Sequence, residues 1–109
     1  MIASCNRRSV SVRDFDVSEY YYQMAIEYYP CGKNIGRIDD ALTARAKAKE
    51  VWREELDCAK CEKGPVEVYF DPNSDCWFVC GVLPKNYLGG VANIIIQADG
   101  YILAVWHDK

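Results

Sequence analysis

The stretch VANIIIQADGYILAVW, residues 91–106, contains the pattern that decides the fold. Two apolar runs flank Asp99-Gly100, a dipeptide typical of a tight β-hairpin turn. With this dipeptide at the centre of the turn, the residues of the two runs pair across the hairpin in a fixed order. One side pairs Ala98 with Tyr101, Ile96 with Leu103 and Ile94 with Val105; the other pairs Gln97 with Ile102, Ile95 with Ala104 and Asn93 with Trp106.

The first side of this hairpin is uniformly apolar, whereas the second mixes apolar groups with amides and an indole. A mixed surface of that kind suits contact with another protein, and coverage by another part of the chain explains it equally well. The candidate partner-binding residues are Trp77, Asn93, Gln97 and Trp106. A register shifted by one residue would turn the last three inward.

Two further strands are expected before the hairpin. Residues 65–70 alternate between apolar and polar side chains, and residues 76–83 are aromatic and β-branched. Residues 71–75 have the composition of a turn, and residues 84–90 that of a loop. We therefore expect about four antiparallel strands joined by short links.

Residues 38–56 predict a helix that lies on this sheet. Asp39 and Asp40 provide negative charge at its start. The apolar residues share one stripe at helical spacing: Ile38, Ala41, Ala44, Ala48, Val51, Trp52 and Leu56. Arg45 and Glu55 lie near that stripe, either reaching solvent at its margins or forming a buried polar pair that faces a pocket.

A shorter helix is expected from Asp16 to about Pro30. Its apolar residues at helical spacing are Val17, Tyr20, Tyr21, Met24, Ala25 and Tyr28, and this stripe favours a core role. Tyr22 and Ile26 add apolar surface on the other side, which suggests a second contact such as a homodimer or partner surface. Residues 1–15 are either disordered or include a short edge strand at residues 9–13.

The order of elements, helices first and then strands, predicts a single α+β domain over residues 1–109. The chain has 13 basic and 16 acidic residues, a net charge of −3 and a pI near 5.1, which argues against nucleic acid as a partner. No apolar run is long enough to span a membrane. Residues 64–109 hold two basic and five acidic residues, which serve solubility or attract a basic partner.

The six cysteines are expected to be mainly free thiols, with disulfides and zinc as alternatives: Cys5, Cys31, Cys58, Cys61, Cys76 and Cys80. If residues 76–80 form a strand, Cys76 and Cys80 lie roughly 13 Å apart and cannot share one zinc ion. We expect no metal and no cofactor. Residues 1–5 lack the basic and apolar parts of an export signal, so we expect a cytoplasmic protein; the alternative is a truncated lipoprotein with Cys5 lipidated.

Catalysis has little support in the sequence. The chain has a single histidine, His107, and no serine-hydrolase, zinc-protease or phosphate-loop motif. We therefore expect a protein that is not an enzyme. The rival interpretation is a small-molecule-binding protein or enzyme with a pocket between helix and sheet, lined by Arg45, Glu55 and tyrosines.

Several short motifs follow one another in residues 36–109: Trp77-Phe-Val-Cys-Gly81-Val-Leu83-Pro84, Leu88-Gly89-Gly90-Val91, Ile94-Ile-Ile96, Asp99-Gly100-Tyr-Ile-Leu103 and Trp106-His107. In order and spacing they resemble the bacterial immunity proteins of polymorphic toxin systems, which have a nuclear-transport-factor-like (cystatin-like) fold. The resemblance implies N-terminal helices packed on a curved sheet. It also implies a non-catalytic protein that binds and neutralises a cognate toxin domain by occlusion. The cysteine pairs are not part of this pattern.

Overall fold

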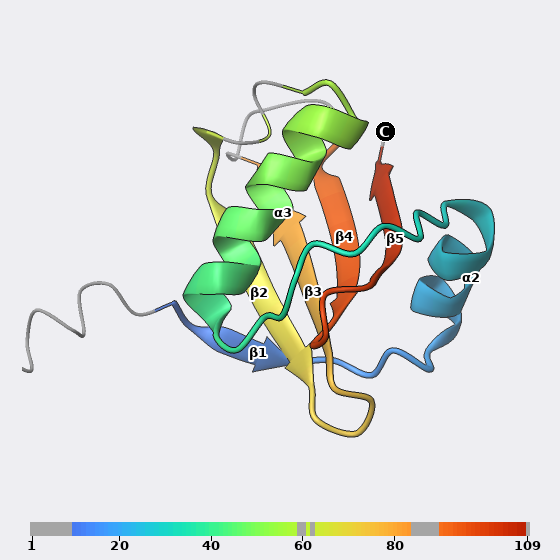
Figure 1. The fold of residues 1–109 in the computed structure, drawn as a ribbon. Coiled ribbons are helices and arrows are strands. Elements are labelled where there is room, and N and C mark those ends of the chain that lie inside the picture. Colours follow the sequence, from blue (N-terminus) through green and yellow to red (C-terminus); the bar gives the residue numbers. More distant parts are fainter. Residues whose placement is uncertain (1–9, 59–60, 62, 84–89, 109) are drawn as a thin grey trace, which may run out of the picture.

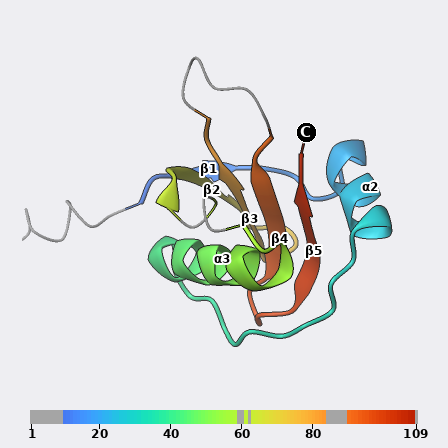
Figure 2. The same ribbon diagram turned by 90° about the horizontal axis from the view of Figure 1, so that it is seen from above.

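The computed structural model describes residues 10–58, 61, 63–83 and 90–108. Its elements, in chain order, are β1 (Val12–Asp14), α2 (Tyr20–Tyr28), α3 (Ala41–Glu55), β2 (Val66–Asp71), β3 (Cys76–Gly81), β4 (Ala92–Gln97) and β5 (Ile102–His107) (Figure 1). The strands form one sheet in the order β1-β2-β3-β4-β5. Figure 2 shows α3 lying across one face of the sheet, while α2 lies beside β5 at its edge. The expected α+β class is confirmed.

The sheet is mixed, which differs from the antiparallel sheet of about four strands that we expected. β1 is a fifth, edge strand and pairs with β2 in parallel, with Val12 opposite Val68. Parallel neighbours need a long crossover connection. Here both helices lie between the two strands in the sequence. The expected edge strand at residues 9–13 is present in part, as β1.

The main core lies between α3 and the sheet. The Asp40 side chain caps the helix by accepting a hydrogen bond from the Thr43 backbone N–H at 2.7 Å. The predicted stripe is buried in the structure, with Leu56 only partly covered. Its alanines let the helix approach the strands closely, and Trp52 supplies most of the volume. The buried residues of this core are Ile38, Ala41, Ala44, Ala48, Val51, Trp52, Val68, Trp77, Val79, Ala92, Ile94, Ile96 and Ile102.

The β4–β5 hairpin keeps the predicted register at one end and loses it near the turn. Asn93 pairs with Trp106, Ile94 with Val105 and Ile95 with Ala104, as expected. A β-bulge then shifts the pairing, so that Ile96 faces Ile102 instead of Leu103. The bulge turns Ile102 toward α3 and places Leu103 against the second core.

A second, smaller core covers the other face of the sheet. Its buried residues are Ala25, Phe78, Ile95, Ala104 and Trp106, with Phe15, Val17, Tyr22, Ile26, Tyr69, Cys80 and Leu103 packed around them. The rings of Phe15 and Phe78 lie 5.7 Å apart, and each also contacts Tyr22. For this face the sequence allowed either contact with another protein or coverage by another part of the chain. In the structure, α2 and the segment before it cover it.

The helix α2 is rotated about its axis relative to the predicted orientation. Of the expected stripe only Ala25 is fully buried, whereas Tyr20, Tyr21 and Tyr28 are exposed. The helix packs through Tyr22, Ala25 and Ile26 instead. If the helix makes the second contact that its apolar residues suggested, the exposed tyrosines make it.

A buried carboxylate fastens the segment before α2 to the β2–β3 turn. Asp71 accepts hydrogen bonds from the backbone N–H of Val17 at 2.9 Å and from the Ser74 hydroxyl at 2.8 Å, both through Oδ2. Its Oδ1 accepts a bond from the Asn73 N–H at 2.9 Å. Because these bonds stabilise the charged form, the Val17 N–H first among them, the pKa of Asp71 is held below its usual value.

Replacing Asp71 with Asn is expected to lower the free energy of unfolding by about 2 kcal/mol at pH 7, because an amide nitrogen cannot accept the two bonds now made to Oδ2. The depressed pKa means that the carboxylate stabilises the fold above the unfolded-state pKa near 3.8 and that this contribution is lost as the pH falls through that range. Urea unfolding of both proteins measures this: the difference in free energy of unfolding between wild type and variant should be smaller at pH 3 than at pH 7. The control is Asp75→Asn in the same turn; an equal loss there would refute the role of Asp71.

No helix in the described ranges is long and apolar enough to cross a membrane. The loop expected at residues 84–90 lies outside the described residues except for Gly90, and so does Cys5.

Candidate partner-binding surface

Three of the four residues that the sequence proposed for partner contact lie in the interior. Trp77 is 7% exposed and packs at a tilt against Phe70 beneath α3, with ring centroids 4.6 Å apart. Asn93 is 2% exposed and donates a hydrogen bond from Nδ2 to the Val91 carbonyl oxygen at 3.1 Å. Trp106 is 5% exposed, and Gln97 is half-buried. Partner contact through these four residues remains a prediction. Because three of them are buried, the exposed residues around Trp106 are the better candidates for a contact surface.

The exposed large side chains beside Trp106 are tyrosines from α2 and its C-terminal end. Tyr20 is 78% exposed and Tyr28 is 63% exposed, and Tyr21 and Tyr29 are also exposed. A short helix that buries one face normally carries polar residues on the other. Aromatic rings in that position are typical of surfaces that bind another protein.

These tyrosines border a groove of about 500 Å³ between α2 and the end of β5. Ala25 and Trp106 belong to the same buried cluster, and both line the groove. We call this surface the tyrosine groove; it is lined by Tyr20, Tyr21, Met24, Ala25, Tyr28, Tyr29, Trp106, His107 and Asp108.

The indole of Trp106 contacts the rings of two tyrosines in the tyrosine groove. It lies 6.1 Å from the ring of Tyr21, edge to face, and 6.2 Å from the ring of Tyr29, nearly parallel to it. Its Nε1 donates a hydrogen bond to Asp108 Oδ1 at 3.1 Å. Contacts of this kind hold the rings in fixed orientations.

The groove and its helical wall carry acidic groups. Asp108 lies in the groove itself, and α2, which forms one wall, carries Glu27 and no lysine or arginine. Partial burial, followed by the charge of Asp108, raises the pKa of Tyr21. Its hydroxyl is therefore protonated at neutral pH. The groove thus offers rings, hydroxyls and carboxylates, which complement a surface rich in lysine or arginine.

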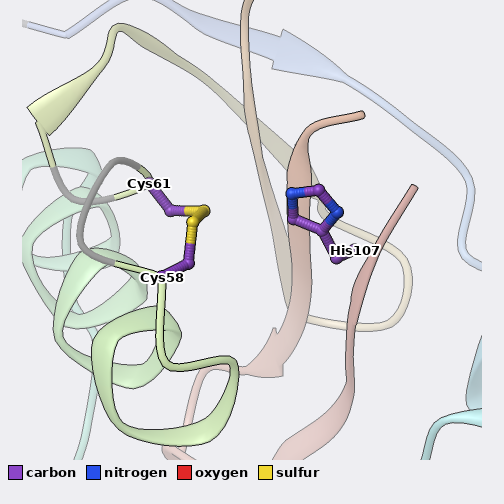
Figure 3. Close-up of side chains that lie close together, drawn as sticks. All are labelled: Cys58, Cys61 and His107. Carbon is purple, nitrogen blue, oxygen red and sulfur yellow. A yellow bond between two sulfur atoms is a disulfide. The ribbon is translucent and has the colours of Figure 1, made fainter. Parts of the chain in front are cut away.

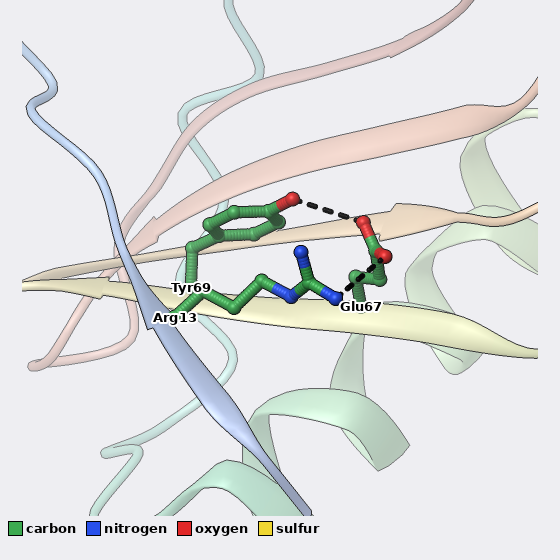
Figure 4. A network of polar contacts seen from close by, with 3 residues as sticks. All are labelled: Arg13, Glu67 and Tyr69. Carbon is green, nitrogen blue, oxygen red and sulfur yellow. Dashed lines mark hydrogen bonds and ion pairs between the residues drawn. The ribbon is translucent and has the colours of Figure 1, made fainter.

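The exposed side of β1 and β2 carries a small polar network (Figure 4). Arg13 lies 3.4 Å from a carboxylate oxygen of Glu67, and the Tyr69 hydroxyl donates a hydrogen bond to the other oxygen at 2.9 Å. An exposed pair of this kind contributes little to stability. The network links the parallel edge strand to its neighbour, and its groups are joined to one another instead of facing a hollow.

The pocket of the rival interpretation is not assembled from the expected groups. Arg45 is exposed, and Glu55 forms an ion pair with Lys33 at the surface. The space between α3 and the sheet is filled by alanine, valine, isoleucine and two tryptophans. The described residues therefore show no polar pair converging between helix and sheet.

Two cysteines expected as free thiols form a disulfide, Cys58–Cys61, just after α3 (Figure 3). Cys31, Cys76 and Cys80 are free. The sequence favoured free thiols because disulfides persist in oxidising compartments, whereas a cytoplasmic protein was expected. His107, at the end of β5, lies beside this disulfide.

The comparisons with known proteins agree with the fold. The family described as NTF2 fold immunity protein matches residues 43–109, which include most of α3 and all of β2 to β5. No curated protein and no solved structure matches the chain. The match extends over more than half of the chain and confirms the nuclear-transport-factor-like fold that the motifs implied. The chain therefore belongs to the NTF2-fold immunity proteins.

Proposed function

We propose that the protein binds and neutralises a cognate bacterial toxin domain by occlusion, without catalysing a reaction, in the cytoplasm of the cell that it protects. The match to the immunity family is the observation that supports this function most directly. The described residues add that the free thiols of Cys76 and Cys80 are poorly suited to nucleophilic catalysis. Burial raises the pKa of both, that of Cys80 to about 11, so neither is a thiolate at neutral pH.

The tyrosine groove is the surface that we propose for the toxin. Aromatic side chains bring large contact area with few rotatable bonds, and tyrosine is enriched among residues that dominate binding energy. The acidic residues around it favour a toxin with a basic contact surface, since complementary charge accelerates association. A toxin domain that acts on nucleic acid has a basic surface of that kind.

The direct test is protection in cells. The gene is co-expressed with the toxin gene that neighbours it, and growth and complex formation are measured. Rescue of growth together with a 1:1 complex would support the proposal. Failure to bind or protect against any neighbouring toxin would refute it.

Replacing Tyr28 with Ala is expected to weaken the affinity for the toxin by about tenfold to hundredfold, because a ring at the centre of an interface commonly contributes over 1 kcal/mol. Stability should change little, since Tyr28 is exposed. Binding by calorimetry and thermal unfolding of the free protein separate the two effects. The matched control is Tyr101→Ala, an exposed tyrosine directly before the start of β5, whereas the groove adjoins the end of that strand. Equal losses in both variants would exclude the groove.

The same variant distinguishes a toxin surface from a homodimer surface. Light scattering of the free protein is expected to give the mass of one chain. A dimer that Tyr28→Ala dissociates would assign the tyrosine groove to self-association, and the toxin would then need another surface.

A further inference from the structure

Three side chains that commonly bind zinc meet where α3 and β5 end. Cys58 and Cys61 follow α3, and His107 is the last residue of β5. Their candidate ligand atoms, two sulfurs and one imidazole nitrogen, all lie within 4.8 Å of one another. Figure 3 shows the imidazole beside the two sulfurs. No metal was expected from the sequence, in which His107 lies far from the cysteine pair.

The three ligand atoms lie close enough together for a zinc site to form once the bond between the two sulfur atoms opens. Zn–S bonds of about 2.3 Å and Zn–N bonds of about 2.0 Å place tetrahedral ligand atoms roughly 3.5–3.8 Å apart. Two cysteines separated by two residues are a common half of such sites. The imidazole of His107 is exposed, so it can turn toward a metal without disturbing the core. Only the sulfur–sulfur bond has to open.

We propose that the reduced protein binds one zinc ion through Cys58, Cys61 and His107, and that the structure holds the oxidised, disulfide form of this site. Three protein ligands leave the fourth position to a water molecule, as in other open zinc sites. The cytoplasm keeps thiols reduced, so the proposed location favours the metal-binding form.

The conversion between the two forms balances as a thiol–disulfide exchange. Two thiols of a small reductant such as glutathione supply two electrons and two protons; the Cys58–Cys61 bond breaks and the reductant becomes a disulfide. Zinc then replaces the protons of the two cysteines, which are released to solvent. The metal and the disulfide exclude each other, since both use the same sulfur atoms.

The other described cysteines do not offer an equivalent site. Cys76 and Cys80 lie in β3, and burial raises the pKa of both thiols. Cys31 is half-buried against the α3 core. None of the three belongs to the cluster of ligand atoms around His107. Zinc binding should therefore depend on one cysteine pair among those that the structure describes.

The site also adjoins the tyrosine groove, because His107 lines that groove and follows Trp106 directly. A metal bound there ties the end of β5 to the turn after α3. The zinc inference does not rest on toxin binding, and its test needs no toxin.

The test measures metal binding by the full chain in both redox states. Protein kept under a phosphine reductant is titrated with zinc against a chromogenic chelator, and cobalt is used as a spectroscopic probe. The reduced chain should bind one zinc ion, and its cobalt form should show a thiolate-to-metal charge-transfer band. The oxidised chain should bind neither ion. Absence of stoichiometric binding by the reduced chain, or equal binding by both forms, would overturn the proposal.

Three variants locate the site. Joint replacement Cys58→Ser and Cys61→Ser should abolish binding, and His107→Ala should weaken zinc affinity at least tenfold, as the loss of even a supporting contact does elsewhere. The control Cys31→Ser should bind like wild type. Circular dichroism confirms that each variant is folded. Unchanged affinity and cobalt spectrum in His107→Ala would reject the histidine ligand and with it the proposed site.

Discussion

Replacing Gly100 with Ala is expected to destabilise the protein by about 3–5 kcal/mol, the combined cost of left-handed backbone and of overlap in a packed region. Gly100 has φ +100°, and a Cβ there would lie 2.2 Å from the carbonyl oxygen of Gly36. The neighbouring contacts are also with backbone atoms of Gly36, at 2.5 and 2.7 Å, so no side-chain rotation can relieve them.

The close approach exists because the segment between α2 and α3 runs along the β4–β5 turn. Ile35 donates a backbone hydrogen bond to the Gly100 carbonyl at 3.0 Å, and Ile38 donates one to Ala98 at 2.8 Å. An added methyl group would push this segment away and weaken both bonds. The start of α3, which follows directly, would lose part of its anchorage.

Gly36→Ala is the matched control for Gly100→Ala. Its φ is +89°, so the backbone cost is similar, but a Cβ there meets nothing within 4 Å. We expect a loss of only about 1–2 kcal/mol for this variant. Chemical unfolding gives the free energy of unfolding of both variants, and the difference between the two values measures the cost of the overlap. Equal losses would show that the overlap costs nothing and would contradict the packing described for the turn.

Replacing Trp52 with Ala is expected to cost about 3–5 kcal/mol, the usual range for removing a large buried ring. Trp52 is fully buried between α3 and the sheet and is the largest side chain with no exposure. The surrounding alanines are too small to fill the space it would leave. A melting midpoint unchanged by this substitution would refute the role assigned to the stripe on α3.

Trp52→Phe separates ring volume from hydrogen bonding. The indole Nε1 of Trp52 is buried with no hydrogen-bond partner, so its removal breaks no bond. We expect a loss of about 1–2 kcal/mol, arising from the smaller ring alone. A loss as large as that of Trp52→Ala would show that the indole N–H has a partner in solution.

The helix on the sheet and most of the strands could be predicted from local pattern. The apolar stripe of residues 38–56 repeats at helical spacing over several turns and has one polar face opposite it. The hairpin register was correct for Asn93, Ile94 and Ile95, because alternation and the turn dipeptide point to the same pairing. The bulge escaped prediction because the turn is centred one residue earlier than expected: the Gly100 N–H donates to the Gln97 carbonyl, which leaves Ala98 and Asp99 as its central residues.

The orientation of α2 could not be read from its own residues. It spans nine residues with apolar side chains all round, so periodicity does not select a buried face. The choice is made by distant rings, those of Phe15 and Phe78, which enclose Tyr22. The same limit applies to Cys58, Cys61 and His107: their proximity depends on how the chain folds back after α3.

The position of α2 has a consequence for how such a molecule can diversify. α2 precedes the family-matched residues 43–109, and it is attached to the sheet by few buried side chains. Its outward rings can therefore be exchanged at small cost to folding. A lineage can exchange the outward residues of α2, where we propose that the toxin binds, while it leaves the inherited scaffold untouched.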